Sequence, residues 1–583
     1  PPYMVPAVTM QIDAIPLNQN QKVNRRALPE PFAEAAQATQ QTVQAPLNIL
    51  EQQLKEMVAG IVNTDNFDIT TDLRLVGLSS ILSIKLATLI YKRFGVQIDA
   101  KKLLKGGSLQ TIENDILEAM MNGNLTPSPY PKEMGAGGNG NAMSAGEAQP
   151  KSCPLSYAQM GVYVDSMRNP TSTVYNTPVC LQFPKDTDCE ALRKAVRRAV
   201  ANHPALFVQF VSEEAGVVQV MGDTGSPIDI GERSMSEEEA RAFRHEFVVP
   251  FNLAKDRLVR FCIVHTDEAL YLYCDMHHLV CDGYSYDLFI REICTLMDGG
   301  SIDAELCSYA QFVADQKAAE GSAAFAEAAE YFSLRLADFD GITEVAPDLT
   351  MPQPMGGNGK VCAPIDWAVA THLAQQQGVT PAAVMLSAVL YTLSRFAATD
   401  NVCITTISNG RSNLKVMGTM GMFVNTLVLT STIGTQTVGE YLAESGQTFS
   451  DTLAHEDYPF ARIAADHDIK ADIMFAYQMD VLGDYKVNGQ TVRAEETMEL
   501  DVPKFKIAFY INEEEGQPSV VIEYDSGLYS TVMMQSLAQS VSNAVQAFAA
   551  DATAPLRSVS LLNREQTALL DSFNATEVPY DDT

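Results

Sequence analysis

The N-terminal part of the chain repeats hydrophobic residues every three or four positions. This spacing runs from Leu47 to Val62 and predicts an amphipathic helix there. A second helix is expected to begin at Ser79-Ser80, and a third is expected over residues 109–120. Strand patterns are almost absent between these segments. Residues 45–122 are therefore predicted to form a small all-α domain, a helical bundle.

Beyond residue 153 helical and strand-like segments alternate, which indicates an α/β fold. The clearest segments are helical at 189–201 and 380–396 and β-rich at 258–264 and 402–406. Residues 123–152 separate this region from the helical bundle. They are rich in Gly, Pro, Ser and Asn, a composition typical of a flexible, partly extended linker.

One strand-like run, which starts at Leu270, ends in the heptapeptide His277-His278-Leu-Val-Cys-Asp282-Gly283. At a period of two, His278 continues an apolar, buried face of the strand, whereas His277 lies on the opposite face. A neutral imidazole there could take a proton from an amine or hold a polar intermediate. Asp282-Gly283 is typical of a tight turn in which glycine lets backbone amides approach a ligand. The alternative, which a bare His-His dipeptide would favour, is a histidine pair that merely closes a strand.

Metal binding is a rival interpretation of the same segment, because Cys274, His277, His278 and Cys281 form two Cys/His pairs at short spacing. Strand alternation places Cys274 and His277 on opposite faces. No second ligand pair lies at the distance expected for a zinc finger. We therefore predict that the site holds no metal, which metal analysis of the purified protein would check.

Charge and cysteine usage narrow the possible partners and compartment. The chain of 583 residues has 72 acidic and 40 basic residues, a net charge of −32. Such a chain should repel nucleic acids and anionic membranes. Its 10 cysteines follow no paired framework, and we find neither a signal peptide nor an apolar stretch of transmembrane length. These features predict a cytoplasmic protein with reduced thiols.

The second motif is the segment Val76-Gly-Leu-Ser79-Ser80-Ile, in which a glycine loop leads into serines at a helix N-terminus. An ordinary serine N-cap is the local alternative. The segment resembles the attachment site of acyl and peptidyl carrier proteins, with Ser79 at a usually acidic or histidine position. The resemblance implies that Ser80 carries 4'-phosphopantetheine, added by a phosphopantetheinyl transferase. A phosphodiester at a helix N-terminus is electrostatically favourable.

The flanking segments resemble other parts of nonribosomal peptide synthetases. Residues 18–29 resemble the last motif of adenylation domains, so that 1–32 would be the C-terminal remnant of such a domain. Residues 153–565 resemble a condensation domain over nearly its whole length. The motifs that carry this resemblance are Leu155–Tyr163, Pro250–Leu253 with Arg260, His277–Gly283, Asn409–Arg411, Met422–Leu427, His455–Phe460 and Met474–Gln478.

This resemblance implies two lobes of the chloramphenicol-acetyltransferase type, at 153–330 and 331–565, with the active site in the cleft between them. Residues 566–583 resemble the connector to a following adenylation domain. The chain would thus be a carrier–condensation didomain, and the resemblance implies that the carrier is a four-helix bundle. An upstream adenylation domain and a downstream aminoacyl-carrier domain would be its partners.

The resemblance also implies roles for the site residues. A thioester on Ser80 would be the donor, and His278 would remove the proton of the acceptor amine or stabilise the charged intermediate. His277 and Asp282 would hold the turn, and Gly283 would let backbone amides reach the developing oxyanion. Asn425 would make polar contacts across the lobe interface.

One departure from the family pattern leaves the partner of Asp282 open. The family's second motif usually supplies arginines near this aspartate, but Asn202 and Phe207 stand there in this chain. Because an unpaired buried carboxylate is costly, a partner should exist, and Arg260 and Arg411 are the candidates.

Two other functions remain possible from the sequence: epimerisation of the carrier-bound residue, and docking of carriers by an inactive condensation-like domain. The segments around Asn425 and His455 and the final stretch from Leu561 to Thr576 favour condensation. The donor and acceptor amino acids and the product are not encoded here. An L-configured donor is the default expectation.

Overall fold

The computed structural model describes residues 151–574, apart from 215, 340, 354–355, 479–484, 496–502 and 515–516. Nearer the N-terminus it describes 49–62, 67–76, 107–121 and, between them, 78, 82–83, 85–87, 89–90, 96, 98 and 103. Three predictions lie outside the described residues: the adenylation remnant at 1–32, nearly all of the linker at 123–152, and the side chain of Ser80.

The described part of the predicted bundle is helical. It contains α2 (Ile49–Val62), the short helix η3 (Leu73–Val76) and α5 (Leu109–Met121), with further helical residues between 82 and 90. The helices predicted from Leu47 and over 109–120 are confirmed to within two residues. Their apolar faces share one buried core, which includes Leu54, Leu86 and Ile116. Four helices in the bundle remain a prediction, because much of this region lies outside the described residues.

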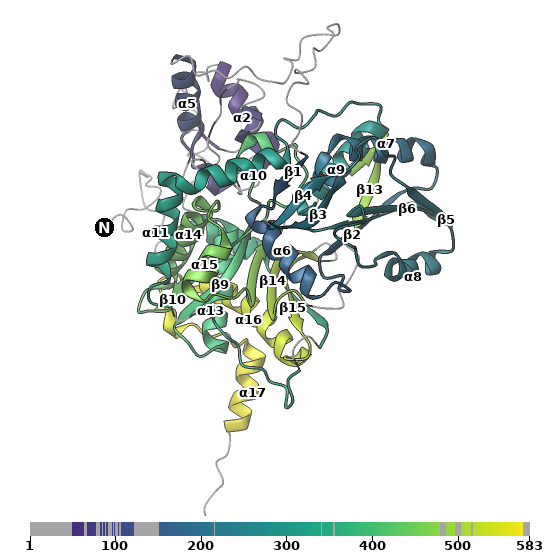
Figure 1. Ribbon diagram of the computed structural model, residues 1–583. Coiled ribbons are helices and arrows are strands. Elements are labelled where there is room, and N and C mark those ends of the chain that lie inside the picture. Colours follow the sequence, from purple (N-terminus) through teal and green to yellow (C-terminus); the bar gives the residue numbers. More distant parts are fainter. Residues whose placement is uncertain are drawn as a thin grey trace, which may run out of the picture.

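The N-lobe is built on a six-stranded sheet with the order β12-β13-β2-β7-β6-β5 (Figure 1). Helices α7 and α9 cover one face, where they pack on the side of β7 that carries Leu272 and Cys274. Helix α8 covers the other face, against Tyr271 and Tyr273. The strands and helices are β2 (Asn176–Pro184), β5 (Ile230–Ser234), β6 (Val259–His265), β7 (Ala269–His277), α7 (Cys189–Asn202), α8 (Glu237–Phe247) and α9 (Gly283–Met297).

Smaller elements complete the N-lobe. A three-stranded sheet has the order β1-β4-β3 and lies next to α6 in Figure 1. The bounds are β1 (Ser152–Pro154), β3 (Val208–Glu213), β4 (Gly216–Met221), α6 (Tyr157–Arg168), η4 (Pro204–Phe207), α10 (Tyr309–Ala318) and η5 (Ala319–Gly321).

The C-lobe contains a second six-stranded sheet, in the order β10-β9-β11-β14-β15-β8. Helices α12, α13, α14 and α16 share its larger core. The strands are β8 (Asn358–Pro364), β9 (Asn401–Ser408), β10 (Asn425–Thr432), β11 (Ile473–Tyr477), β14 (Ile507–Glu514) and β15 (Gln517–Asp525). The helices are α12 (Trp367–Gln377), α13 (Pro381–Phe396), η6 (Leu414–Val416), α14 (Val438–Ala454), α15 (Phe460–His467), α16 (Thr531–Ala550) and η7 (Leu556–Ser558). Two helix-covered mixed sheets confirm the expected α/β architecture of two lobes.

Two segments belong to the opposite lobe from the one that the predicted boundary at 330/331 assigns to them, wholly or in part. Strands β12 (Tyr485–Val487) and β13 (Gln490–Glu495) follow C-lobe elements, yet β13 pairs with β2 of the N-lobe. Helix α11 (Ala323–Leu336) spans the predicted boundary and packs on the C-lobe through Phe332 and Tyr458. Hydrophobic periodicity reports that a segment is a strand, but it does not report which sheet the strand joins.

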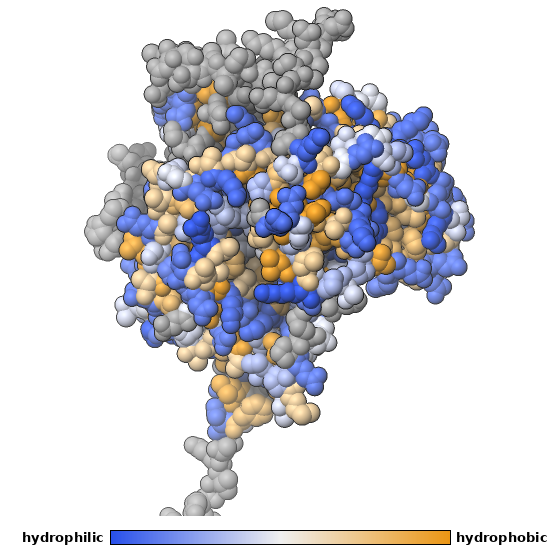
Figure 2. Space-filling model, viewed as in Figure 1, coloured by the Kyte–Doolittle hydropathy of each residue, from blue (hydrophilic) through white to orange (hydrophobic). Residues whose placement is uncertain are grey.

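The predicted C-terminal connector begins as a helix, α17 (Arg564–Asn574), which projects from the end of the C-lobe (Figure 1). Leu570 and Phe573 on α17 are exposed, and hydrophobic colour marks this helix in Figure 2. Among the described residues, no single helix has both the length and the apolar composition needed to cross a membrane. Helices α12 and α13 meet that criterion only as a pair bent by 102°.

Candidate active site between the lobes

The heptapeptide joins the end of β7 to the start of α9. His277 is the last residue of β7, and residues 278–280 form the turn. The predicted tight turn at Asp282-Gly283 is wrong: Asp282 is the N-cap of α9, where its carboxylate accepts a hydrogen bond from the backbone N–H of Ser285 at 2.8 Å. Aspartate favours turns and helix N-caps for the same reason, because its short side chain bonds nearby backbone amides.

His277 is buried and holds the turn. Its Nδ1 accepts a hydrogen bond from the backbone N–H of Leu279 at 3.2 Å, and its ring lies between Tyr175 and Phe251. Burial lowers the pKa of His277 to about 3, and the charges of His278, Lys504 and Arg260 act in the same direction. A neutral, enclosed imidazole fits the predicted architectural role.

His278 lines a cavity of about 1120 Å³ between the two lobes. Burial lowers its pKa to about 4, and Lys504 reinforces this effect, whereas Asp282 and the backbone carbonyls of His278 and Cys281 oppose it. Nδ1 is buried, which leaves Nε2 as the ring nitrogen that can meet a substrate. The imidazole is therefore neutral at neutral pH.

Asp282 pairs with Arg411, one of the two candidates. Nη2 of Arg411 lies 3.2 Å from Oδ1 of Asp282, and both side chains are fully buried. Oδ2 of Asp282 also accepts the backbone N–H of Phe423 at 3.0 Å. Because Asp282 belongs to the N-lobe and both partners belong to the C-lobe, this carboxylate joins the lobes beside His278.

The Arg411 side chain is fixed on several sides. Nη1 donates to the backbone carbonyls of Val416 and Thr419, each at 2.8 Å, and Nη2 donates to Oγ of Ser285 at 2.9 Å. The guanidinium also lies over the rings of Phe423 and Tyr284. Planar geometry and several donors suit arginine to such a buried site.

Arg260, the other candidate, pairs instead with Asp275 at 3.1 Å. Asn176 donates to the same carboxylate oxygen of Asp275 at 2.8 Å. Burial raises the pKa of Asp275 to about 7, although Arg260 and Asn176 lower it. This cluster lies on the His277 face of β7, so Arg260 supports the strand and does not contact Asp282.

Asn202 and Phe207, which stand where the condensation family usually has arginines, have structural roles of their own. Asn202 donates to the carbonyl of Asp303 at 2.9 Å, and Phe207 is buried in the N-lobe core. Between them, His203 lies 2.9 Å from Glu292 and 2.7 Å from Glu305. Burial lowers the pKa of His203, but the two carboxylates outweigh it and raise the pKa to about 9.

Asn425 lines the cavity, but its predicted contact across the lobe interface is wrong. Its side-chain amide donates to the backbone carbonyls of Glu456 and Tyr458 at 2.7 and 2.8 Å. All three residues belong to the C-lobe. Asn425 therefore joins the start of β10 to the loop between α14 and α15.

Gly283 is the first residue of α9 and lines the cavity next to His278. The first N–H groups of a helix have no intrahelical partner and lie at the positive end of its dipole. Gly283 thus lies at the helix N-terminus that lines the cavity with His278, and its role near an oxyanion stays a prediction.

The helical N-terminal domain forms part of the wall of this cavity. Arg74, Leu78 and Lys85 of that domain line the cavity together with His278 and Gly283. Met417 belongs to the same buried core as the domain's apolar residues, and Tyr284 packs against it. The segment before Ser80 thus faces the cavity that contains His278.

Sequence reasoning did not anticipate how Gln159 and Lys504 contribute. The side-chain amide of Gln159 donates to the carbonyl of Leu279 at 2.8 Å and so holds the heptapeptide turn. The local signal is a Ser156-x-x-Gln159 capping box at the start of α6, but nothing in the sequence connects it to Leu279. Lys504 lines the cavity from the C-lobe and depresses the pKa of both histidines.

The Cys/His residues of the heptapeptide do not converge on a point. Among the described residues, the group of three Cys, His, Asp or Glu side chains with ligand atoms within 4.8 Å of one another consists of Cys189, Glu232 and His265. Cys274 packs in the core beneath α7 and α9. Strand alternation correctly separates it from His277.

Comparison with known families and proteins agrees with this geometry. The condensation domain family matches residues 149–570, and the phosphopantetheine attachment site family matches residues 52–116, which include Ser80. Surfactin synthase subunit 1 of Bacillus subtilis is 26% identical over 603 residues and covers 100% of this chain. Tyrocidine synthase 2 of Brevibacillus parabrevis is 27% identical over 599 residues, again over 100% of the chain. The chain spans about 16% of the length of each of these relatives.

Solved structures share the fold of the two lobes. The X-domain from teicoplanin biosynthesis superimposes with a TM-score of 0.63 at 17% identity, over 72% of this chain and 99% of that one. The first condensation domain of the calcium-dependent antibiotic synthetase, solved with a substrate analogue, gives a TM-score of 0.60 at 19% identity, over 71% and 99%. The chain belongs to the condensation domain family and carries a phosphopantetheine attachment domain ahead of its condensation domain.

Proposed function

We propose that this chain forms peptide bonds in nonribosomal peptide synthesis. The donor is an aminoacyl or peptidyl thioester on the carrier domain, and the acceptor is the α-amine of an aminoacyl group on a downstream carrier. The amine nitrogen bonds to the thioester carbonyl carbon, the C–S bond breaks, and the thiol of the donor carrier receives a proton. A transferase reaction of this kind needs no external oxidant or metal.

One observation carries this proposal: His278 and residues of the carrier domain line the same cavity. A donor on the carrier domain would therefore enter the same cavity as the imidazole. Holding two reactants by tethers in one cavity can replace a large part of the entropic cost of a bimolecular reaction, up to about 7–11 kcal/mol in well-oriented cases.

The described residues near Ser80 fit a phosphopantetheine arm. Arg74 and Lys85 bring positive charge to the cavity wall, which a phosphodiester would favour, and Leu82 provides apolar surface beside them. Arg74 is itself paired with Asp72 at 2.6 Å, so its orientation is fixed. When attached to Ser80, phosphopantetheine supplies a thiol that carries the acyl group as a reactive thioester.

The low pKa of His278 favours one of its two predicted roles. A base whose conjugate acid has a pKa of about 4 holds a proton weakly, so it is a poor acceptor of a full proton from an amine. It remains a good hydrogen-bond acceptor. We therefore assign Nε2 of His278 to orient the acceptor amine and to stabilise the positive charge that develops on its nitrogen.

The N-terminus of α9 complements this role. Negative charge develops on the thioester oxygen during the attack, and Gly283, the first residue of α9, lines the same cavity as His278. The pair formed by Asp282 and Arg411 holds the helix start in place. His278 and α9 thus serve the two charges of the same transition state.

The partners follow from this reaction. An upstream adenylation domain would load the donor, a phosphopantetheinyl transferase would modify Ser80, and a downstream carrier would bring the acceptor. Epimerisation is the second candidate reaction of the same cavity. Docking of carriers without catalysis is the third candidate function.

Reconstitution separates these three functions. The chain is modified by a phosphopantetheinyl transferase, loaded with an L-aminoacyl group at Ser80 and mixed with a separately loaded downstream carrier. Dipeptide on the downstream carrier is the expected product. A D-aminoacyl group recovered from Ser80 without dipeptide would establish epimerisation, and loading with neither product would establish docking alone.

A further inference from the structure

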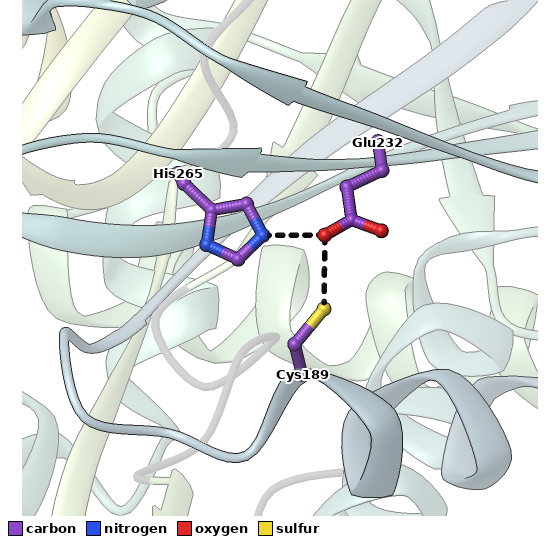
Figure 3. A group of neighbouring side chains, drawn as sticks. All are labelled: Cys189, Glu232 and His265. Atoms are coloured by element: carbon purple, nitrogen blue, oxygen red, sulfur yellow. Dashed lines mark hydrogen bonds and ion pairs between the residues drawn. The ribbon is translucent and has the colours of Figure 1, made fainter.

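Three potential metal ligands converge on the N-lobe, away from the cavity between the lobes. Nε2 of His265 and Sγ of Cys189 both lie next to Oε1 of Glu232, at 2.9 and 3.7 Å (Figure 3). The three ligand atoms lie within 4.8 Å of one another. None of these residues lines the cavity that contains His278.

Sheet register and helix packing bring these residues together. Glu232 lies on β5 opposite Ile263 of β6, and His265 is two residues further along β6 on the same face. Ile263 packs in the core covered by α7, and Cys189 is the first residue of that helix. The three side chains therefore come from three rigid elements at the edge of one sheet.

The spacing of the ligand atoms fits a small tetrahedral ion. With Zn–S, Zn–N and Zn–O distances of about 2.3, 2.0 and 2.0 Å, tetrahedral geometry requires separations of roughly 3.3 Å between N and O and roughly 3.5 Å between S and O. The observed values are 2.9 and 3.7 Å. Shifts of a few tenths of an ångström in partly exposed side chains would close the difference.

The second oxygen of Glu232 is already fixed. Oε2 accepts a hydrogen bond from Arg193 at 2.5 Å, and Arg193 also donates to the carbonyl of Ile230 at 2.8 Å. Oε1 is thereby left facing His265 and Cys189. Partners in this outer position orient metal-binding carboxylates in many proteins.

We propose that Cys189, Glu232 and His265 bind one Zn²⁺ ion. Thiolate and imidazole ligands select zinc over magnesium or calcium, and a single carboxylate completes three protein ligands. The thiol of Cys189 releases its proton on binding, so that one sulfur–metal bond replaces one S–H bond. Glu232 and His265 are 47% and 37% exposed, which leaves the fourth position open to water.

Bound there, the ion joins the start of α7 to the edge strand β5 and the end of β6. A ligand that binds the folded state alone raises stability in proportion to the logarithm of its concentration above Kd. The bound ion would stabilise the edge of the N-lobe sheet and would not contact the residues around His278. Its presence or absence is independent of peptide-bond formation.

Cobalt is a direct probe, because Co²⁺ occupies zinc sites and a thiolate ligand gives it a strong near-ultraviolet charge-transfer band. The untagged, metal-free chain of 583 residues is titrated with Co²⁺ and then with Zn²⁺. We expect one Co²⁺ per chain, a thiolate band that Zn²⁺ abolishes, and a thermal midpoint that rises with added Zn²⁺. Absence of the band would overturn the proposal.

Matched variants locate the site. Cys189→Ser should abolish the charge-transfer band, and His265→Gln should abolish tight one-to-one binding. Cys362→Ser, at an exposed cysteine of β8, and His372→Gln, at an exposed histidine of α12, should change neither. Circular dichroism without metal establishes that each variant is folded. A band that survives in Cys189→Ser would place the metal elsewhere and refute the assignment.

Discussion

Asp282 of the N-lobe and Arg411 of the C-lobe form an ion pair of 3.2 Å that is closed to solvent on both sides. The pair lies directly behind the start of α9, where Asp282 caps the helix next to His278. Arg411 also lies 4.6 Å from the ring centre of Tyr284, which packs on the carrier domain. One guanidinium thus contacts the lobe interface, the helix start beside His278, and Tyr284, which packs against the core of the N-terminal domain.

Asp282→Asn should destabilise the condensation domain by about 3–5 kcal/mol, because it leaves the Arg411 charge buried without a partner. Asparagine still caps α9, so the loss reports the missing charge and not the cap. The measurement is the urea unfolding midpoint.

The control is Asp400→Asn, which removes the partner of Arg557 in a half-exposed ion pair of 2.6 Å. Such surface pairs contribute about 0–1 kcal/mol. Equal losses of stability in the two variants would show that the buried ion pair stabilises the fold no more than a surface pair does.

His278→Ala should slow dipeptide formation by about 10²-fold or more while the loading of Ser80 stays normal. The pH profile is a sharper test of its role. Since the pKa of His278 is about 4, its imidazole stays neutral between pH 8 and pH 6, and its protonation should not lower the rate in that range.

Rates of condensation measured from pH 8 to pH 5.5 in the wild type and in His278→Ala check this expectation. The ratio of the two rates should stay constant. A ratio that falls with a midpoint near 6.5 would mean that His278 titrates as an ordinary histidine and would contradict the low pKa.

His203 should make stability depend on pH on the alkaline side. Its pKa is raised from 6.5 to about 9 by Glu292 and Glu305, so the folded state keeps a proton that the unfolded state has lost. This contribution is fully present below pH 6.5 and is lost as the pH rises through about 9.

Urea midpoints at pH 6, 7.5 and 9 test this. His203→Gln should be less stable than the wild type at pH 6 and should lose less stability toward pH 9. His372→Gln, at an exposed histidine of α12, should keep the wild-type slope. If the urea midpoints of the wild type and His203→Gln changed equally with pH, His203 would not contribute to the pH dependence of stability.

Ser80→Ala should leave the protein folded and abolish the mass increase that a phosphopantetheinyl transferase produces. Ser79→Ala is the matched control, since it changes the neighbouring hydroxyl and keeps Ser80. Intact-protein mass spectrometry reads both variants. Modification that persists in Ser80→Ala and disappears in Ser79→Ala would shift the attachment site by one residue.

Met417→Glu should slow condensation from the tethered donor, because Met417 is only 9% exposed where it meets the carrier core. A charge there would be desolvated by the docked carrier. Met351→Glu, at an 80% exposed methionine, is the control. Transferase modification of Ser80 should be unchanged in both variants. An unaffected rate in Met417→Glu would refute a role in condensation for the contact between Met417 and the carrier core.

Local patterns were sufficient for a large part of the fold. Helical spacing located α2 and α5, and the period of two along β7 placed Cys274 and His277 on opposite faces. Both patterns reflect backbone geometry, which neighbouring residues in the chain determine. The same patterns could not assign β13 to the N-lobe sheet, since pairing with β2 is a contact between residues far apart in sequence.

The sequence by itself determined the family of the chain, the position of the histidine motif and the helical nature of the carrier region, because each depends on residues close together in the chain. The tertiary structure alone decided that Asp282 pairs with Arg411 and Arg260 with Asp275, and that Asn425 bonds within its own lobe. It also brought Cys189 to Glu232 and His265. A buried charge takes whichever partner the packing of distant elements places within reach, and that choice has no local signature.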